Sequence, residues 1–353
     1  MSLMNDFLRS MHLRNGSDLH VIAGDPPRMR VHGDLITLDN QRLDPEELKS
    51  ELFGIMSDTS LNQFNVHDSA DFAHAIPDVA RFRVNVFRHL NGIGAVFRGI
   101  PSKALTLEEL NMPKALNELA TATRGLILVT GKTGSGKSTT LAAVVDAINS
   151  RLKGHILTIE DPIEFVHERK NCLMSQREVG VHSQSFADAL HSALREDPDA
   201  ILVGELRDLE TMSIAMTAAE MGVLVMGTLH TNGAAATIDR VVNIFPSDKQ
   251  DHVRNMLSTS LRGVVSQQLL KKKDGTGRTV ALEILINTSA AANLIRQGKL
   301  EQLENVMQSS GANGMCTMDG SLKRLLDGGV ISGEEAYLQA FDKAKFEQFK
   351  DIA

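Results

Sequence analysis

The sequence predicts an α/β protein of two domains, a small α+β domain followed by a larger domain of alternating strands and helices, with further helices at the C-terminus. The chain has 353 residues, more than a typical single hydrophobic core accommodates. Residues 1–100 mix short helical and strand-like patches, whereas apolar strand-like runs alternate with helical patterns from residue 107 onward. A glycine-rich loop separates one such run from the helix after it.

The first domain shows alternating polar and apolar residues typical of half-buried strands. In Arg81–Arg88, for example, Phe82, Val84 and Val86 alternate with polar residues. Asp44 followed by Pro45 marks the start of a helix, as an N-cap and a first-turn proline. The predicted elements are a helix through Phe7–Met11 that ends near Asn15-Gly16, strands at Leu19–Ile22 and Met29–Val31, a helix at Pro45–Ile55, and paired strands at Arg81–Arg88 and Gly94–Ile100.

The glycine-rich loop has the residue types of a phosphate-binding loop. It follows the apolar run Gly125–Val129 and precedes a helix with Leu141, Val144, Val145 and Ile148 on one face. Glycines let the backbone curl so that N–H groups surround phosphates, a lysine reaches the β- and γ-phosphates, and a serine hydroxyl binds Mg²⁺. The loop therefore predicts binding of a nucleoside triphosphate, ATP with Mg²⁺, through Gly131, Lys132, Thr133, Gly134, Ser135, Gly136, Lys137, Ser138 and Thr139.

Polar residues follow three further predicted strands, at 156–159, 200–203 and 223–226. Ligands bind at the carboxyl ends of strands in such sheets, so these residues are expected to face the phosphates. We expect Glu164 to orient the attacking water, Glu160 to help hold the metal with Ser138, and Glu205 to complete the metal site. His230 is a candidate γ-phosphate contact. Taken alone, the acidic segment with Glu160 and Glu164 can also be read as a solvated turn, and His230 as a structural histidine.

Several other segments have two readings. Asp208 either caps a helix or, with Arg207, links subunits. Residues 271–275 are most simply a solvated hairpin turn, with a phosphate-binding patch as the other reading. Ser185 is a predicted N-cap, and helices are expected from Thr288 to the end. Arg83 and Arg98 lie on the paired strands of the first domain, where arginines are commonly solvated, although in a ring they would reach a neighbour's nucleotide.

Composition excludes several classes of protein. A net charge of −7, a pI near 6.0 and 4% aromatic residues argue against nucleic-acid binding. No apolar stretch approaches the roughly 20 residues that span a bilayer, and the N-terminus lacks the features of a signal peptide. Cys172 and Cys316 are too few and too far apart for a disulfide framework. We therefore expect a cytoplasmic protein without an integral membrane segment.

Taken together, the motifs resemble the PilT family of type IV pilus retraction ATPases, within the secretion ATPase superfamily. The resemblance covers nearly the whole chain. Its motifs are residues 16–20 (GSDLH), 26–31 (PPRMRV), 81–85 (RFRVN), the phosphate-binding loop, the acidic box at 160–164 (EDPIE), 194–199 (LREDPD), 203–208 (VGELRD), the histidine box ending at 228–232 (TLHTN), 238–240 (IDR) and 245–246 (FP).

The resemblance implies a homohexameric ring that turns or shifts the inner-membrane platform protein of the pilus, at the cytoplasmic side of that membrane. It implies a PAS-like domain at residues 1–100, a linker at 101–106, a RecA-like ATPase core at 107–287 and a helical region at 288–353. It also implies Glu164 as the catalytic glutamate, Glu205 as the Walker B acid and His230 as the γ-phosphate sensor. Arg83 and Arg98 fall where the inter-subunit arginines of the family lie, with Arg81 as a third candidate.

Three departures from the family pattern stand out. Lys132 replaces a proline in the loop, and Val223 replaces the first histidine of the histidine box. The C-terminal motif at 290–297 lacks its first arginine and its final acid, which brings it closer to the accessory PilU type, so a paralogous retraction ATPase is a further candidate partner. Other readings are an assembly or type II secretion ATPase, a small-molecule kinase and a nucleotide-binding regulator without turnover. The absence of a tetracysteine motif disfavours an assembly or secretion ATPase, and the leading domain of about 100 residues disfavours a small-molecule kinase. The intact phosphate-binding loop and acidic residues disfavour a regulator without turnover.

Overall fold

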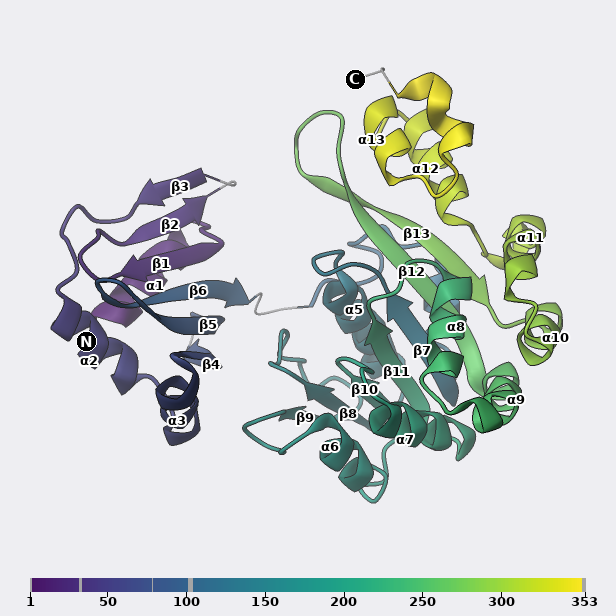
Figure 1. Ribbon diagram of the computed structural model, residues 1–353, viewed down its shortest axis with the longest axis horizontal. Coiled ribbons are helices and arrows are strands. Elements are labelled where there is room, and N and C mark those ends of the chain that lie inside the picture. The colour runs from purple at the N-terminus through teal and green to yellow at the C-terminus, as the bar shows by residue number, and fades with distance from the viewer. Residues whose placement is uncertain (1, 32–33, 78, 101–103, 351–353) are drawn as a thin grey trace. The chain divides into compact units, whose positions relative to one another are not determined.

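The computed structural model describes residues 2–31, 34–77, 79–100 and 104–350 (Figure 1). The chain forms two compact units. The first comprises Met1–Ala104 with the segments Asp161–Val166 and Glu178–His182, and the second comprises Leu105–Glu160, His167–Arg177 and Ser183–Ala353. Half of the linker expected at 101–106 lies outside the described residues, since 101–103 are not described.

The first unit is built on a six-stranded antiparallel sheet with the order β3-β2-β1-β6-β5-β4. One face of this sheet is apolar, and three helices contribute to the same core, with Leu8, Leu52 and Phe64 among their buried residues. The elements are α1 (Leu3–Leu13), β1 (Asp18–Ile22), β2 (Arg28–Val31), β3 (Asp34–Thr37), α2 (Pro45–Gly54), α3 (Asp58–His67), β4 (Ser69–Ile76), β5 (Ala80–His89) and β6 (Gly92–Ile100).

Local signals in the sequence account for the elements that were predicted here. The Asp44 side chain accepts hydrogen bonds from the N–H groups of Glu46 and Glu47, with Pro45 at the first helical position, as expected. In β5 Phe82, Val84 and Val86 are buried, and Arg83 on the other face is directly opposite Arg98 of β6. Strands β3 and β4 and helix α3 were not predicted.

The second unit contains a seven-stranded sheet with the order β13-β12-β7-β11-β10-β8-β9. Neighbouring strands from β12 to β8 run parallel, and β12 pairs with β13 in an antiparallel hairpin. The strands are β7 (Gly125–Thr130), β8 (His155–Glu160), β9 (Leu173–Glu178), β10 (Ala200–Val203), β11 (Leu224–Leu229), β12 (Leu261–Lys271) and β13 (Arg278–Ile286). The predicted strands are all present, each within a few residues of its expected bounds.

Helices cover this sheet and continue to the C-terminus. They are α4 (Lys114–Leu119), α5 (Lys137–Arg151), α6 (Phe186–Ala193), α7 (Leu209–Glu220), α8 (Ala234–Asn243), α9 (Gln250–Ser260), α10 (Ser289–Gln297), α11 (Leu303–Ser309), α12 (Met318–Asp327) and α13 (Gly333–Gln339), with four short 3₁₀ helices between or after them. The Ser185 side chain caps α6 by accepting the Asp188 N–H, as predicted. No helix among the described residues is both long and apolar enough to cross a membrane.

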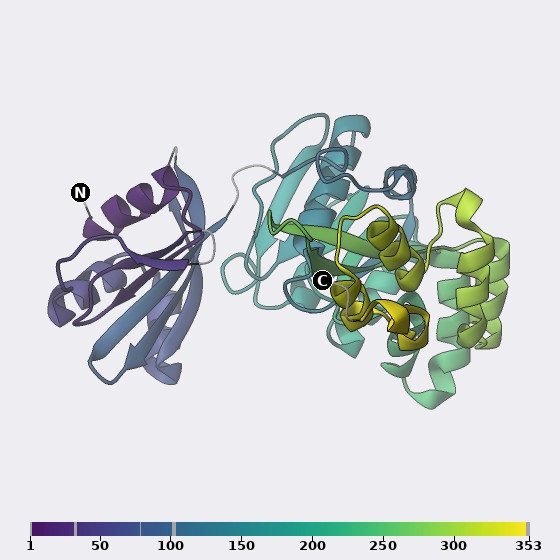
Figure 2. The same ribbon diagram turned by 90° about the horizontal axis from the view of Figure 1, so that it is seen from above.

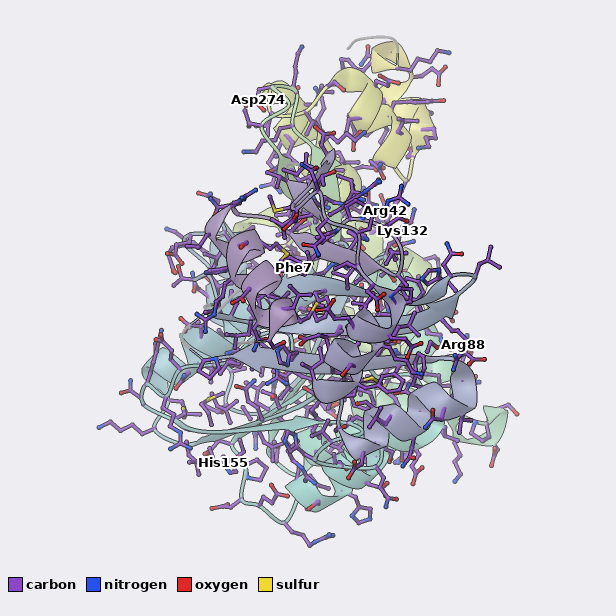
Figure 3. All side chains as sticks on the ribbon, turned by 90° about the vertical axis from the view of Figure 1, so that its left-hand side faces the viewer. Phe7, Arg42, Arg88, Lys132, His155 and Asp274 are labelled. Carbon is purple, nitrogen blue, oxygen red and sulfur yellow. The ribbon has the colours of Figure 1, made fainter. Side chains whose placement is uncertain are left out.

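The hairpin β12–β13 reaches the C-terminal helices. Its turn contains Asp274, whose carboxylate accepts from the Thr276 N–H, which confirms the predicted hairpin turn (Figure 3). Figures 1 and 2 both place α12 and α13 beside this hairpin, and Lys273 donates its N–H to the Val330 carbonyl. The helical C-terminal tail was expected from the sequence and is present from Ser289 onward.

Candidate nucleotide-binding site

The predicted phosphate-binding loop connects the carboxyl end of β7 to the start of α5. Gly131, Gly134 and Gly136 have φ values of 142°, 78° and 87°, which residues with a Cβ adopt at a cost. At Gly131 space is also short, because an added Cβ would lie 2.4 Å from the Gln267 carbonyl oxygen and 2.6 Å from Ser135 Oγ. The first N–H groups of α5 have no intrahelical partner and carry the positive end of its dipole. The loop therefore has the shape that anion binding requires.

Lys137 lies within this loop rather than in solvent. Its Nζ donates to the carbonyl oxygens of Gly131 at 2.8 Å and Lys132 at 3.1 Å. Ser135 Oγ is buried without a hydrogen-bond partner in the described structure, a donor that a phosphate oxygen would satisfy. By contrast, the Lys132 side chain is exposed, so its charge lies outside the interior of the loop (Figure 3).

Two other strand ends bring charged groups to Lys137. His230, directly after β11, places Nδ1 3.5 Å from Lys137 Nζ and Nε2 3.3 Å from Glu205 Oε1. Glu205, two residues after β10, also pairs through Oε2 with Arg207 at 2.7 Å. Lysine, histidine, glutamate and arginine thus form a continuous chain of polar contacts. The prediction that these strand ends converge is confirmed for Lys137, Glu205 and His230.

Backbone hydrogen bonds fix the segment that carries Glu205. Gly204 donates its N–H to the Ile159 carbonyl at 2.7 Å, and Leu206 donates to the Thr228 carbonyl at 3.0 Å. The Thr228 hydroxyl donates in return to the Gly204 carbonyl at 2.5 Å. These bonds tie the residues on both sides of Glu205 to the strands β8 and β11, so the carboxylate projects from a rigid support.

Arg207 was missed as a site residue, although it contacts Glu205 directly. Burial alone raises the pKa of Glu205, but the hydrogen bond and charge of Arg207, with a contribution from His230, outweigh burial and lower that pKa below its usual value. Glu205 is therefore anionic at neutral pH, as a metal ligand must be. Asp208 accepts from the Thr211 N–H and hydroxyl at the start of α7, which makes it a helix cap. The capping reading of Asp208 is confirmed.

The remaining predicted residues have other surroundings. Glu160 ends β8, where Oε1 accepts from the Thr158 hydroxyl at 2.7 Å and from Gln176 at 3.4 Å. Glu164 belongs to a segment of the first unit, as do Arg83 and Arg98.

Each of the first unit's candidate arginines has an acidic neighbour. Arg83 Nε lies 4.0 Å from Asp71, Arg98 pairs with Asp18 at 2.9 Å, and Arg81 pairs with Glu178 at 2.6 Å. The structure thus brings none of them together with Lys137 within one unit.

The donor set for a metal is partial. In the described parts of the chain, no three His, Cys, Asp or Glu side chains are arranged to hold a metal ion. Ser138 in the first turn of α5 and the anionic Glu205 could offer two oxygen ligands, a number that suits Mg²⁺ because Mg²⁺ keeps several waters and is shared with phosphates. These residues fit a metal bound together with a nucleotide rather than a metal bound by protein alone.

Comparison with known proteins identifies the family. The profile of the family "Type II/IV secretion system protein" matches residues 1–328. The chain belongs to this family. It is 53% identical over 323 residues to the type IV pilus retractation ATPase PilT of Pseudomonas aeruginosa, which covers 92% of this chain and 94% of that protein. It is 41% identical over 333 residues to the type IV pilus ATPase PilU of the same organism, which covers 94% of this chain and 89% of that protein.

A solved structure agrees with this assignment. The crystal structure of the pilus retraction motor PilT with bound ADP superposes with a TM-score of 0.91 at 43% identity, covering 99% of each chain. The recognition of a PilT-like ATPase from sequence motifs is therefore confirmed, as are the α/β fold class and the assignment as an ATPase. The kinase and inactive-regulator readings are set aside.

Proposed function

We propose that this secretion ATPase is the motor that retracts a type IV pilus and so drives twitching motility. The observation that carries the proposal is the 53% identity to a pilus retraction ATPase over 92% of the chain, against 41% to PilU. The nucleotide site supports it, since the lysine and serine that ATP hydrolysis requires begin α5, and the acid after β10 is linked to that lysine through His230.

Each residue of the site has a proposed role in hydrolysis. Lys137 contacts the β- and γ-phosphates, and its bonds to two loop carbonyls keep its ammonium at the mouth of the loop. Ser138 and Glu205, with Glu160 at the end of the neighbouring strand β8, would hold Mg²⁺, which would neutralise phosphate charge when bound. His230, 3.5 Å from Lys137 Nζ, would hydrogen-bond the γ-phosphate. The loop backbone at Thr133, Gly134, Gly136 and Thr139, with the unsatisfied Ser135 hydroxyl, would bind the remaining phosphate oxygens.

Residues of the first unit are proposed to complete the site. Glu164 would orient the attacking water, and Arg83 and Arg98 would stabilise transferred charge on a neighbouring subunit's nucleotide in a homohexamer. Arg98 is tied to Asp18, which leaves Arg83, at 4.0 Å from Asp71, the less constrained of the two. We also propose the division into a PAS-like domain at 1–100, a linker at 101–106, a RecA-like core at 107–287 and a helical region at 288–353.

The proposed partner is the inner-membrane platform protein of the pilus, which the motor would reach from the cytoplasm. An accessory role beside a paralogous ATPase is the second candidate, because the motif at 290–297 is only half kept. In α10 the retained Arg296 lies 3.4 Å from Ser258 Oγ of α9, a contact inside the chain. Of the two altered positions, Ala292 is half-buried and Gln297 is exposed.

The decisive experiment counts surface pili on cells whose only copy of the protein carries Lys137→Ala. Excess pili with loss of twitching are expected if the motor pulls, and bald cells would show that it pushes. Lys153→Ala, at an exposed lysine just after α5, is the matched control. Expression of the wild-type chain in cells lacking every retraction ATPase separates the two candidates, because a principal motor restores twitching alone and an accessory one does not.

A further inference from the structure

Strand β12 lies between β7, which leads into the phosphate-binding loop, and β13, its partner in the hairpin. It runs parallel to β7, with Ser266 beside Thr130 at the point where the loop begins. Successive strand residues face opposite sides of a sheet. Val265 packs in the core cluster that includes Val144 and Val145 of α5, so Gln267 lies on the α5 side and Ser266 on the other.

Gln267 uses both ends of its side-chain amide on the loop and on α5. Its Nε2 donates to the Ser135 carbonyl at 2.6 Å, and its Oε1 accepts from the Thr140 hydroxyl at 2.9 Å. The side chain is 1% exposed, so both bonds are shielded from water. Its backbone carbonyl occupies the space where a Cβ of Gly131 would stand. One residue thus contacts the loop at its beginning, near its end and in the first turn of the helix.

The opposite face of the same strand contacts the segment that carries His230. Ser266 Oγ accepts the Gly233 N–H at 2.9 Å. Glu283, which is directly opposite Ser266 on β13, accepts the next N–H, that of Ala234, through Oε1 at 2.6 Å. Its other oxygen, Oε2, accepts the Met318 N–H at the start of α12 at 3.1 Å. Neighbouring residues of β12 therefore hold two segments: Gln267 holds the one with Lys137, and Ser266 holds the one with His230. The Lys137 and His230 side chains contact each other.

We propose that Gln267 is a positioning residue that holds the phosphate-binding loop in its binding shape, while Ser266 with Glu283 does the same for the segment that carries His230. The inference deepens the proposed ATPase function and rests on it. A buried glutamine is unfavourable unless both ends of its amide are hydrogen-bonded, and here both bonds go to the phosphate-binding loop and α5. The hairpin sets the separation of two groups that act on the same phosphate.

The two halves of the proposal predict different defects. The loop binds phosphates present in both ADP and ATP, so loss of the Gln267 bonds should weaken both nucleotides. The His230 segment faces the γ-phosphate, which only ATP has, so loss of the Ser266 bond should slow hydrolysis without affecting ADP. A purely structural role would move neither quantity in this selective way.

The first test is Gln267→Met in the full chain, which keeps the side-chain length and removes both hydrogen bonds. We expect the Kd for ADP, measured by calorimetry, to rise about tenfold, with Tm and oligomeric state close to wild type. Gln268→Met is the matched control, because Gln268 is the next residue on β12 and its Oε1 has no partner in the described structure. A Kd for ADP within twofold of wild type would overturn the proposal.

A second variant covers the case in which Gln267→Met does not fold. Thr140→Val removes only the hydroxyl that orients the Gln267 amide, and we expect it to raise the Kd for ADP about threefold. An unchanged Kd would count against the amide as the positioning group. Where both variants fold, combining them should give no more weakening than Gln267→Met alone, and additive effects would show that Thr140 acts independently.

The second half is tested with Ser266→Ala. We expect kcat for ATP to fall about tenfold while the Kd for ADP stays within twofold; an unchanged kcat, or equal losses in both, would contradict the assignment. Lys137→Ala measured in parallel separates the two levels of inference. If Lys137→Ala binds and hydrolyses ATP normally, the proposed function fails; if only the hairpin variants are normal, the function stands and the positioning role fails.

Discussion

The two loop glycines Gly131 and Gly134 differ in their surroundings, and this difference gives a quantitative prediction. Both have positive φ, but a Cβ at Gly134 would meet nothing within 4 Å, whereas one at Gly131 would lie 2.4 Å from a backbone oxygen of β12. For Gly134→Ala, left-handed strain of about 1–2 kcal/mol is partly offset by the less flexible unfolded chain. We expect a net loss of about 1 kcal/mol.

For Gly131→Ala the penalties add. A residue with a Cβ at this φ costs about 1–3 kcal/mol, and displacing the strand carbonyl costs about as much again. The expected loss of about 4 kcal/mol corresponds to a Tm decrease of about 10 °C, compared with a few degrees for Gly134→Ala. Differential scanning calorimetry without nucleotide measures both. Equal Tm values for the two variants would refute the argument that contact with β12 shapes the loop.

Three further predictions concern single residues. Burial lowers the pKa of His167 from 6.5 to about 4, so as the pH falls this histidine is protonated in the unfolded chain before it is protonated in the folded one. The free energy of unfolding is therefore unaffected above pH 6.5 and decreases by up to ~3 kcal/mol as the pH approaches 4. His167→Gln should flatten this dependence of unfolding free energy on pH, and an unchanged slope would argue against it. Glu205→Gln should retain ATP binding but hydrolyse at least about 100-fold more slowly in a phosphate-release assay; loss of nucleotide binding would contradict its role. Asp208→Ala should cost about 1 kcal/mol by removing the cap of α7, whereas Asp208→Asn should cost little, and equal losses in thermal denaturation would show that the cap is not the cause.

The central elements of the fold were predictable because their signals are local. The run before Gly131 is buried at every position, and the cap at Asp44 depends on residues within one turn. By contrast, β3 is exposed throughout, so it has no apolar face for a pattern to reveal. In strand β4 the polar residues Asp71 and His74 interrupt the apolar ones, and only pairing with β5 identifies it as a strand.

The site was predictable as far as strand ends define it. Because parallel strands finish at one edge, Glu205 and His230 could be placed near Lys137 without knowledge of the sheet order. Arg207 was missed because its pairing with Glu205 depends on the path of the segment after β10. Gln267 was missed although a signal existed, since two consecutive glutamines interrupt an apolar strand and a buried amide needs a partner. The partner itself, Ser135, is 132 residues away in the sequence.

The double role of Glu283 limits how this chain can be recombined with its relatives. Its two oxygens cap the first turns of α8 and α12, which lie on opposite sides of residue 288, where the helical tail begins. A hybrid chain joined at residue 288 takes the Glu283 carboxylate and the N–H of residue 234 from one parent, and the N–H of residue 318 from the other. Exchange of the tail between motors is therefore sound only when residue 283 and the backbone around 318 come from the same parent.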